Sequence, residues 1–388
     1  MHIHTVKAGD TIFKIARQYS TSPMKIIENN ELTSPDRLSV GQKLLILNPT
    51  RTYTVRGRDD LRSIAERFGI KYDTILKNNP YLAGTDKIYP GQLLAIKYDV
   101  PPYGIAAANG YYYKGTPKEK LELALPYLTY ITVAQGKREG EGIKFLFDSH
   151  DVVSAAREAK KIPLMRVYDD SLDFGDTYAE NLIRAAQERG YSGIMLAPYR
   201  ATKEKNKALA DFLLHLKKLA MEADLLIFCE LDGNEEAMIP DVCDGYSITY
   251  EKGALEEIPS FRDGEERVMK NYAESGESSK MYFEIPSFAY MGGEELTKSE
   301  AERLAHTSGK EILYDEEQKM CHFDYNKYTA GKREVINVYY ESPENVKAKL
   351  DLIGELGFMG ITFDIMRIPV EYLMMFASMF STPSQYNL

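Results

Sequence analysis

Five carboxylates stand in or just after short apolar runs, where they could serve general acid–base chemistry. If these runs are strands of a barrel, their carboxyl-terminal ends meet at one mouth, which is where barrel enzymes carry catalytic groups. Glu230 with Asp364 would then be a candidate acid–base pair. The alternative is that all five are surface or ion-paired carboxylates. They are Glu230, Asp232, Glu251, Glu284 and Asp364.

One apolar run ends without any carboxylate. Residues 194–197 lead into Pro198, Tyr199 and Arg200, and an amphipathic helix is predicted over 207–220 from its leucine and phenylalanine stripe. A buried strand that feeds a crossover helix has this pattern. The run is therefore either a plain core strand or an active-site strand that has lost its acids.

The sequence predicts neither a metal site nor a cofactor. Cys229, Cys243 and Cys321 lie far apart, and the histidines at 150, 215, 306 and 322 have no ligand spacing. No glycine-rich dinucleotide or phosphate-binding motif follows any predicted strand.

Composition bounds the classes of partner. The chain has 388 residues, is 44% hydrophobic and carries a net charge of −10, which predicts two or three globular domains. So acidic a chain is a poor candidate for binding nucleic acid or anionic lipid. No signal-peptide core and no apolar stretch of membrane-spanning length is present, so we expect synthesis in the cytosol without a signal peptide and no membrane span.

The region after residue 103 alternates strands with helices, which favours an α/β fold. Eight βα-like units over this length fit a (β/α)8 TIM-type barrel, and a doubly wound open sheet is the second choice. The predicted strands are 104–108, 130–134, 163–167, 193–197, 225–231, 245–250, 281–285 and 360–363.

The first hundred residues contain an internal repeat of strand, helix, helix, strand. Thr5-Val6 recurs as Thr54-Val55, Asn29-Asn30 as Asn78-Asn79, and Gly41-Gln42 as Gly91-Gln92. Asp10 is the expected N-cap of the first helix. Residues 97–103 are a predicted linker, which gives expected domains at 1–49, 50–98 and 99–388.

The motif TVxxGDTxxxIA, then NN, then VGQ or PGQ, resembles a tandem pair of LysM modules over residues 4–96. The resemblance implies binding of peptidoglycan or a chitin-like glycan in a groove between two loops of each module. In the second module Arg58 replaces the motif glycine and Asp60 the threonine. The implied glycan-binding residues are Gly9, Asp10, Thr11, Ile12, Asn30 and Leu32, then Arg58, Asp59, Asp60, Leu61, Pro80 and Tyr81.

Residues 104–369 resemble family 18 glycoside hydrolases, particularly the LysM-bearing N-acetylglucosaminidases of the bacterial spore cortex. The phrases that carry this resemblance include "NGYYYKGTPKEKLELALPYLTYITVAQGK" at 109–137, "CDGYSITYEKG" at 243–253 and "SKMYFEIPSFAYMG" at 279–292. In this family a glutamate after the fourth strand protonates the glycosidic oxygen, and the substrate's own acetamido group attacks the anomeric carbon.

The four positions of the family's acidic motif fall on Ser192, Met195, Ala197 and Tyr199. Tyr199 would stand at the proton donor, and its side chain has an ordinary pKa near 10. Ala197 would stand where an acid orients the acetamido group. Tyr250, which the resemblance implies as an acetamido contact, is retained and is followed by Glu251.

Two functions remain open at the sequence level. The first is a glycan-binding protein of the spore coat, cortex or cell wall whose barrel has lost catalysis. The second is an active N-acetylglucosaminidase that cleaves β-1,4 bonds with a relocated acid, for which the low-ranked candidates are Glu230, Glu251, Tyr250 and Asp364.

Overall fold

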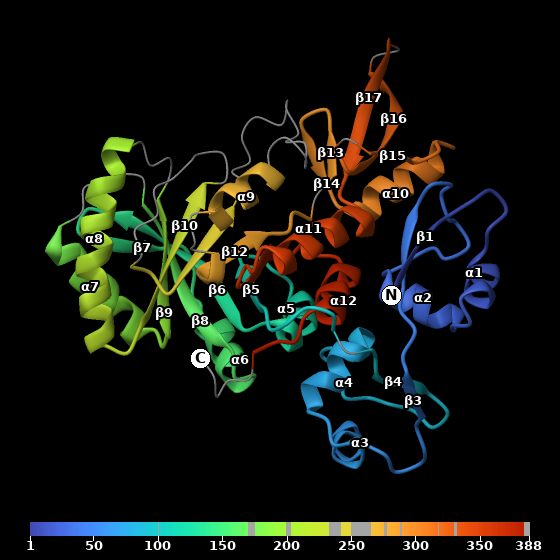
Figure 1. Ribbon diagram of the computed structural model, residues 1–388, viewed down its shortest axis with the longest axis horizontal. Helices are drawn as coiled ribbons and strands as arrows, with labels where there is room; N and C mark the ends of the chain where they lie inside the picture. Colours follow the sequence, from blue (N-terminus) through green and yellow to red (C-terminus); the bar gives the residue numbers. More distant parts are fainter. Residues whose placement is uncertain are drawn as a thin grey trace.

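The computed structural model describes most of the chain. The described residues are 1–99, 101–169, 175–198, 203–232, 242–249, 265–274, 278–287, 289–316, 318–329 and 332–383. Figure 1 shows two small lobes beside a larger body, with a hairpin projecting from its upper edge. None of the described helices is long and apolar enough to cross a membrane.

The first small lobe is built from the first half of the repeat. β1 (His2–Thr5) pairs antiparallel with β2 (Lys43–Ile46), and α1 (Ile12–Gln18) and α2 (Pro23–Asn29) lie between them in sequence. The apolar spacing of α1 places Ile12, Ile15 and Ala16 in one small core.

The second small lobe repeats this plan. β3 (Arg51–Thr54) pairs antiparallel with β4 (Leu93–Lys97). Between them lie α3 (Leu61–Phe68), α4 (Tyr72–Asn78) and the short 3₁₀ turn η1 (Pro80–Leu82). The module has its own core around Leu61, Ile64 and Ile75.

Eight parallel strands close into a barrel in the described part of the chain, which confirms the predicted TIM-type fold. β5 pairs on one side with β18 and on the other with β6, so the sheet has no open edge in this circuit. The strands, in order around the barrel, are β5 (Ala107–Tyr112), β6 (Tyr130–Glu139), β8 (Ile162–Asp169), β9 (Gly193–Pro198), β10 (Leu226–Asp232), β11 (Gly245–Thr249), β12 (Met281–Glu284) and β18 (Gly360–Asp364).

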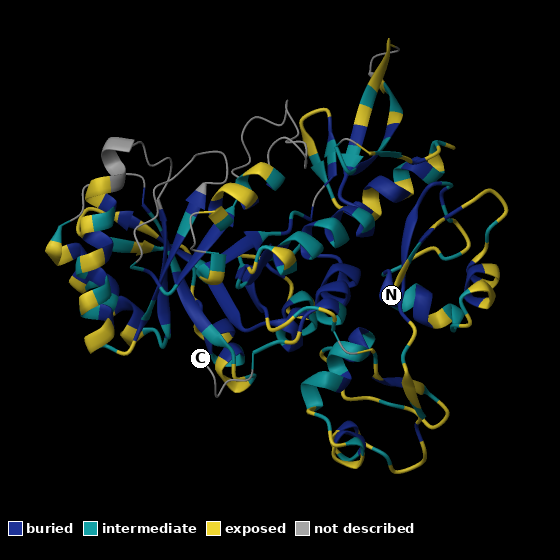
Figure 2. Cartoon of the chain, in the orientation of Figure 1, coloured by how far each residue is buried: buried dark blue, intermediate teal, exposed yellow. Residues whose placement is uncertain are grey.

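Alternate residues of these strands belong to two cores. Met195, Phe228 and Tyr282 share a cluster inside the barrel, whereas Leu196 and Cys229 belong to the larger core between strands and helices. Figure 2 shows the buried strands at the centre of the body and exposed residues on its outer helices.

Helices follow most of the strands and cover the barrel. β7 (Gly142–Phe145) adds an antiparallel strand to β6. The helical segments are α5 (Lys118–Ala124), η2 (Leu125–Tyr127), α6 (His150–Glu158), α7 (Asp176–Glu188), α8 (Lys203–Glu222), α9 (Glu266–Glu274), η4 (Ser278–Lys280), α11 (Pro343–Glu355) and α12 (Val370–Met379).

An inserted subdomain lies between β12 and α11. It is an antiparallel five-stranded sheet of order β14-β13-β17-β16-β15, packed against one helix through its own apolar cluster. Its elements are β13 (Ala289–Met291), β14 (Glu294–Leu296), α10 (Lys298–Thr307), β15 (Leu313–Asp315), β16 (Met320–Thr329) and β17 (Lys332–Tyr340).

The predicted boundary of the first barrel strand is wrong. We expected residues 104–108, but β5 runs from Ala107 to Tyr112. The polar Asn109 and the glycine at 110 interrupt the apolar run, so the pattern stops too early. In the barrel Asn109 is buried and its side chain bonds Thr132 on the neighbouring strand at 2.8 Å.

Candidate functional site

The strand without acids turns Ala197 toward the inside of the barrel. Met195 lies in the interior cluster and Leu196 in the outer core, so the next residue faces inward again. Ala197 is buried, at 3% exposure. Ser192 precedes β9, and its backbone pairs with the neighbouring strands through Pro163 and Leu226. Tyr199 lies outside the described residues.

An ion pair spans the inside of the barrel across this strand. Arg166 on β8 donates from Nε to Glu230 Oε2 at 2.7 Å and from Nη2 to Oε1 at 2.8 Å. Both side chains are mostly buried, at 17% and 16% exposure. In the register of the sheet Arg166 on β8 is paired with Met195 on β9. Cys229 on β10 is paired with Leu196, so the next residues, Glu230 and Ala197, are also neighbours. The small Ala197 side chain leaves room for this bridge between β8 and β10.

Tyr111 on β5 completes the coordination of Glu230. Its hydroxyl donates to Glu230 Oε2 at 3.1 Å and hydrogen-bonds Ser247 Oγ at 2.9 Å. Burial, and then the negative charge of Glu230, raise the pKa of Tyr111 well above its ordinary value. Both oxygens of Glu230 already accept from donors, so the side chain is built as an acceptor rather than as a proton donor.

Three of the predicted carboxylates gather around Tyr113 at the mouth. The ring of Tyr113 stacks on Tyr111 at 6.3 Å, and its hydroxyl lies within electrostatic range of Glu230, Glu284 and Asp364. Asp364 accepts the backbone N–H of residue 366 at 2.9 Å. The strands that carry these three acids, β10, β12 and β18, all end at this mouth. Tyr250 and Glu251 lie outside the described residues, as does the side chain of Asp232.

Sequence reasoning missed Arg166 and Tyr111. Tyr111 fell outside the predicted first strand because that strand was placed too early. Arg166 carried a visible signal, since a cation inside the apolar run 163–167 needs a buried partner. The partner itself could not be read from the sequence, because Glu230 is 64 positions away.

The expected N-cap of the first module is wrong. Thr11, not Asp10, caps α1 by accepting from the backbone N–H of Lys14 at 3.2 Å. Asp10 instead accepts the N–H of Lys7 at 2.8 Å and lies 3.0 Å from His4 Nε2. The hydrogen bond from Lys7, followed by those involving His4, lowers the pKa of Asp10. These hydrogen bonds of Asp10 hold the loop that begins at Gly9 in place. Ile12, which follows in α1, is buried.

The second module keeps the same loop despite its altered motif. Arg58 adopts φ +75°, close to the +82° of Gly9. Asp59 accepts from Tyr53 Oη at 2.6 Å and from the N–H of Arg56 at 2.7 Å, as Asp10 does in its own module. Asp60 caps α3 in a reciprocal capping box with Ser63, and Leu61 is buried.

The predicted groove residues after the second helix have structural partners. The side-chain amide of Asn30 forms hydrogen bonds with the backbone of residues 26 and 45. The side-chain amide of Asn79 forms the equivalent hydrogen bonds with the backbone of residues 75 and 95. Leu32 is half-buried at the core edge. Pro80 is buried, and Tyr81 lies under Lys25 of the first module, whose Nζ is 4.6 Å from the ring. This side of the second groove therefore faces the first module.

The described residues contain no group of three or more His, Cys, Asp or Glu side chains that could hold a metal ion. The three cysteines are unpaired and buried.

Comparison with known proteins identifies the two small lobes. Residues 4–47 and 53–97 each match the LysM domain model, so the chain carries two LysM domains ahead of a TIM-type barrel.

The same arrangement occurs in solved structures. The spore cortex-lytic enzyme SleL of Bacillus megaterium QM B1551 is 23% identical and superimposes with a TM-score of 0.75 over 98% of both chains. SleL of Bacillus cereus is 19% identical with a TM-score of 0.75, covering 98% of this chain and 99% of that one. A chitinase from Chromobacterium violaceum has a TM-score of 0.60 at 16% identity, covering 70% of this chain and 98% of its own. At these identities the likeness establishes the fold.

Curated relatives align over short stretches. An endolysin of Bacillus phage B103 is 29% identical over 99 residues, which is 24% of this chain and 38% of the endolysin. The cell wall-binding protein YocH of Bacillus subtilis is 32% identical over 110 residues, 27% of this chain and 37% of YocH. The chain thus spans little more than a third of the length of these relatives.

Proposed function

We propose that this protein binds peptidoglycan, or a related polymer of N-acetylglucosamine, and that its barrel does not hydrolyse that polymer by the substrate-assisted route. Two LysM domains support the binding half, because the relatives that align with part of this chain include an endolysin and a cell wall-binding protein. The likeness of the whole chain to spore cortex-lytic enzymes supports a location at the spore cortex or cell wall.

One observation carries the loss of catalysis. Ala197 faces the barrel interior at a position where the family resemblance requires an acid, and the Arg166–Glu230 pair crosses the space beside it. A methyl group cannot orient an acetamido group or stabilise the developing cation. The carboxylate on the neighbouring strand, Glu230, is engaged by Arg166 and Tyr111. The resemblance also places Tyr199, whose ordinary pKa is near 10, at the proton donor, and loss of general-acid catalysis costs about 10²–10⁴-fold in rate.

Sedimentation and turnover measured on the same sample test both halves. Purified protein is mixed with spore-cortex peptidoglycan or with chitin, and the pellet and the reducing ends in the supernatant are quantified. We expect the protein in the pellet and no release of reducing ends above a protein-free control. Release of muramyl fragments that disappears only with substitutions in the barrel mouth would show an active enzyme.

A second function is favoured by the carboxylates around Tyr113. Glu230, Glu284 and Asp364 all reach its hydroxyl electrostatically, so the mouth retains acids for a rebuilt acid–base site. A hydrolase of this kind would turn over a chitobiose-type substrate and lose that activity in Glu230→Gln, Glu284→Gln or Glu251→Gln. The matched control is Glu158→Gln, an exposed carboxylate at the end of α6, away from the mouth. The absence of turnover at high protein concentration would exclude this function.

A further inference from the structure

The first LysM domain is fixed to the inserted subdomain at a closely packed joint. The N–H of Ile312 donates to the carbonyl of Val40 at 2.9 Å, and Gln42 Nε2 donates to Glu302 Oε2 at 2.9 Å. Gly41 lies so close that a Cβ added there would stand 1.7 Å from the Ile312 carbonyl oxygen. The turn that ends the first LysM repeat is thus a docking element in this chain.

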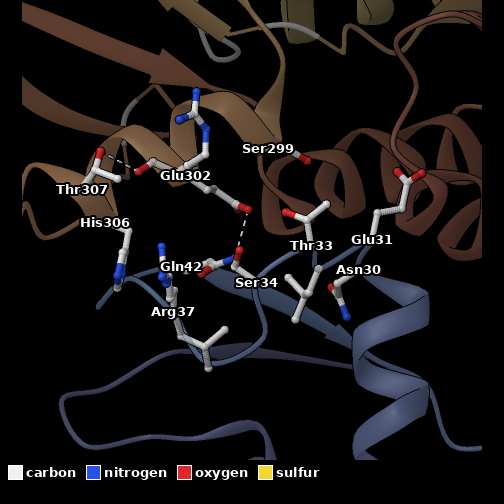
Figure 3. Close-up of a pocket in the computed structure, with 13 residues that line it drawn as sticks. Asn30, Glu31, Thr33, Ser34, Arg37, Gln42, Ser299, Glu302, His306 and Thr307 are labelled. Carbon is white, nitrogen blue, oxygen red and sulfur yellow. Dashed lines mark hydrogen bonds between the residues drawn. The ribbon is translucent and has the colours of Figure 1, made fainter.

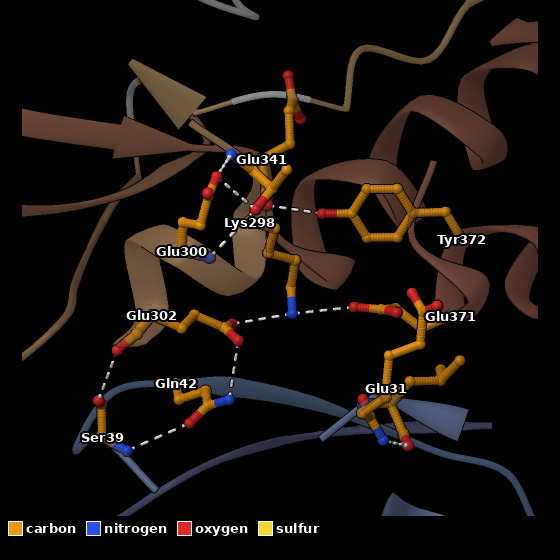
Figure 4. Close-up of polar contacts among 12 residues, drawn as sticks. Glu31, Ser39, Gln42, Lys298, Glu300, Glu302, Glu341, Glu371 and Tyr372 are labelled. Carbon is orange, nitrogen blue, oxygen red and sulfur yellow. Dashed lines mark hydrogen bonds and ion pairs between the residues drawn. The ribbon is translucent and has the colours of Figure 1, made fainter. Parts of the chain in front are cut away.

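A buried ammonium anchors α10 behind this joint. Lys298 Nζ lies 2.9 Å from Glu302 and 2.9 Å from Glu371 of α12, and all three side chains are less than a tenth exposed. Burial alone would lower the pKa of Lys298, but the two carboxylates raise it above its ordinary value. Figure 4 shows this chain of contacts running from Glu371 through Lys298 and Glu302 to Gln42 and Ser39. Helix α10 is therefore held in a set position against the LysM domain.

A cavity of about 150 Å³ lies between these two parts. One wall is the loop after α2 of the first LysM domain, and the other is α10. Figure 3 shows Arg37 from one wall and His306 from the other among the residues that line the cavity. The lining residues are Asn30, Glu31, Leu32, Thr33, Ser34, Arg37, Leu38, Gln42, Ser299, Glu302, Arg303, His306 and Thr307.

The charges of this cavity favour an anionic ligand group. Its two carboxylates have cationic partners outside the cavity: Glu31 pairs with Lys120 at 3.1 Å, and Glu302 with Lys298. Arg37 has only a loose, exposed contact with Asp36 at 3.9 Å among the described side chains. Arg37 therefore leaves a guanidinium group that is available to a carboxylate.

None of the four residues of the loop at Gly9–Ile12 lines this cavity, whereas Asn30 and Leu32, from the other side of the implied LysM groove, do. The size also restricts the ligand. Sites for drug-sized molecules occupy about 300–1,000 Å³, so this cavity accepts a single sugar unit or its substituent.

We propose that the first LysM domain and α10 together bind the acidic unit of a peptidoglycan strand, an N-acetylated amino sugar that carries a lactyl carboxylate. This inference rests on the proposed function and narrows its ligand. Arg37 pairs with the carboxylate and His306, from the opposite wall, hydrogen-bonds it, while the hydroxyl and amide groups of the two walls bind the sugar. The inserted subdomain is then part of the glycan-binding site, and the protein binds glycan strands that bear this acid more tightly than neutral chitin.

Isothermal titration of the full chain with three hexasaccharides tests the inference. The probes are a peptide-free peptidoglycan strand with free lactyl carboxylates, the same strand with those carboxylates methyl-esterified, and chitohexaose. We expect the free acid to bind about tenfold more tightly than the ester, as one charge-assisted hydrogen-bond pair provides. Arg37→Gln and His306→Ala, one on each wall, should each remove most of this preference, and Arg17→Gln on exposed α1 should preserve it.

The outcomes separate this inference from the proposed function. Equal affinity for acid and ester, or a preference that survives both wall substitutions, overturns the composite acidic site while glycan binding stands. Failure of the wild-type chain to bind any of the three probes, or intact peptidoglycan, overturns both. Loss of binding to chitohexaose in Arg37→Gln as well as to the acid would assign Arg37 to general glycan binding and also overturn the inference.

Discussion

Ala197 and Glu230 lie next to each other on neighbouring strands inside the barrel. Neither residue supplies a free carboxyl group. The position that faces the lumen on β9 carries only a methyl group, and the acid on β10 is tied to Arg166 and Tyr111. The consequence is a barrel mouth that retains carboxylates, while Ala197, where the family resemblance implies an acid that orients the acetamido group, carries no polar atom.

Removing one partner of the Arg166–Glu230 pair should destabilise the barrel. Arg166→Met leaves a mostly buried carboxylate with Tyr111 as its remaining donor, and we expect a loss of about 2–3 kcal/mol, somewhat below the range for fully buried pairs. The double variant Arg166→Met/Glu230→Gln should recover more than half of this loss, because no charge is then left unpaired. Denaturant midpoints measure both. A double variant as unstable as the single one would mean that the pair is not the cause.

The backbone at Arg58 stores strain that Gly9 avoids. Both residues have positive φ, and a side chain there costs about 1–2 kcal/mol in the left-handed region. Arg58→Gly should therefore stabilise the second LysM domain by about 0.5–1 kcal/mol after the entropy of the unfolded glycine is counted.

Gly9→Ala is the converse substitution, because it adds a side chain at the equivalent position of the first module. An added Cβ at Gly9 meets nothing within 4 Å, so the substitution isolates the backbone effect and should weaken the first domain. Hydrogen exchange of the α3 and α1 amides measures the two local stabilities. Unchanged or faster exchange in α3 of Arg58→Gly would contradict the expectation.

At the scale of elements, periodic apolar patterns predict strands and helices, whereas contacts between residues far apart in the sequence cannot be predicted. The strand at 193–197 and the helix at 207–220 were predicted because their apolar periods are strong, and β9 and α8 include them. The first barrel strand was displaced because Asn109 breaks its pattern. The docking of Gln42 against Glu302 had no local signal, since 260 positions separate the two residues and the same Gly-Gln pair recurs at 91–92 without it.

The contact between β17, α11 and the start of α9 should make stability depend on pH. Glu341 and Glu265 share the buried ammonium of Lys349, at 2.8 and 2.6 Å. Burial, opposed by Lys349 and reinforced by Glu265, raises the pKa of Glu341 above its ordinary 4.5. Because the folded-state pKa lies above the unfolded one, the stability contributed by this carboxyl is complete below pH 4.5 and is lost as pH rises through the folded-state value.

The pH effect can be isolated with one substitution. The raised pKa of Lys349 keeps it charged throughout this window. Glu341→Gln retains an acceptor for Lys349 but cannot ionise, so Tm should fall less between pH 4.5 and neutral pH than in the wild-type chain. The exposed Glu334→Gln on β17 is the control. Parallel Tm curves for wild type and Glu341→Gln would show that the cluster does not titrate in this range.

In the whole molecule both LysM domains are docked on the barrel rather than tethered to it. The second meets the barrel through Tyr127 Oη, which donates to the Lys77 carbonyl at 2.7 Å, and through Lys161 and Asp73 at 3.2 Å. The first meets the inserted subdomain through Gly41 and Gln42. A glycan strand bound by the first domain is therefore presented to α10 in one orientation, which a flexible linker would not achieve.

The repeat provides a matched pair of substitutions for this docking. Gly41→Ala and Gly91→Ala impose the same backbone penalty, since φ is +86° and +89°, but only at Gly41 does the new Cβ meet a backbone oxygen. We expect Gly41→Ala to separate the first domain from α10, with faster hydrogen exchange in α10 and a more extended small-angle scattering profile. Gly91→Ala should change neither, because nothing lies within 4 Å of its Cβ. If both variants keep the wild-type scattering profile and α10 exchange, the joint tolerates displacement at Gly41. The fixed presentation of the glycan would then have to come from the other contacts of the first domain, such as Glu31 with Lys120 and Lys43 with Glu344.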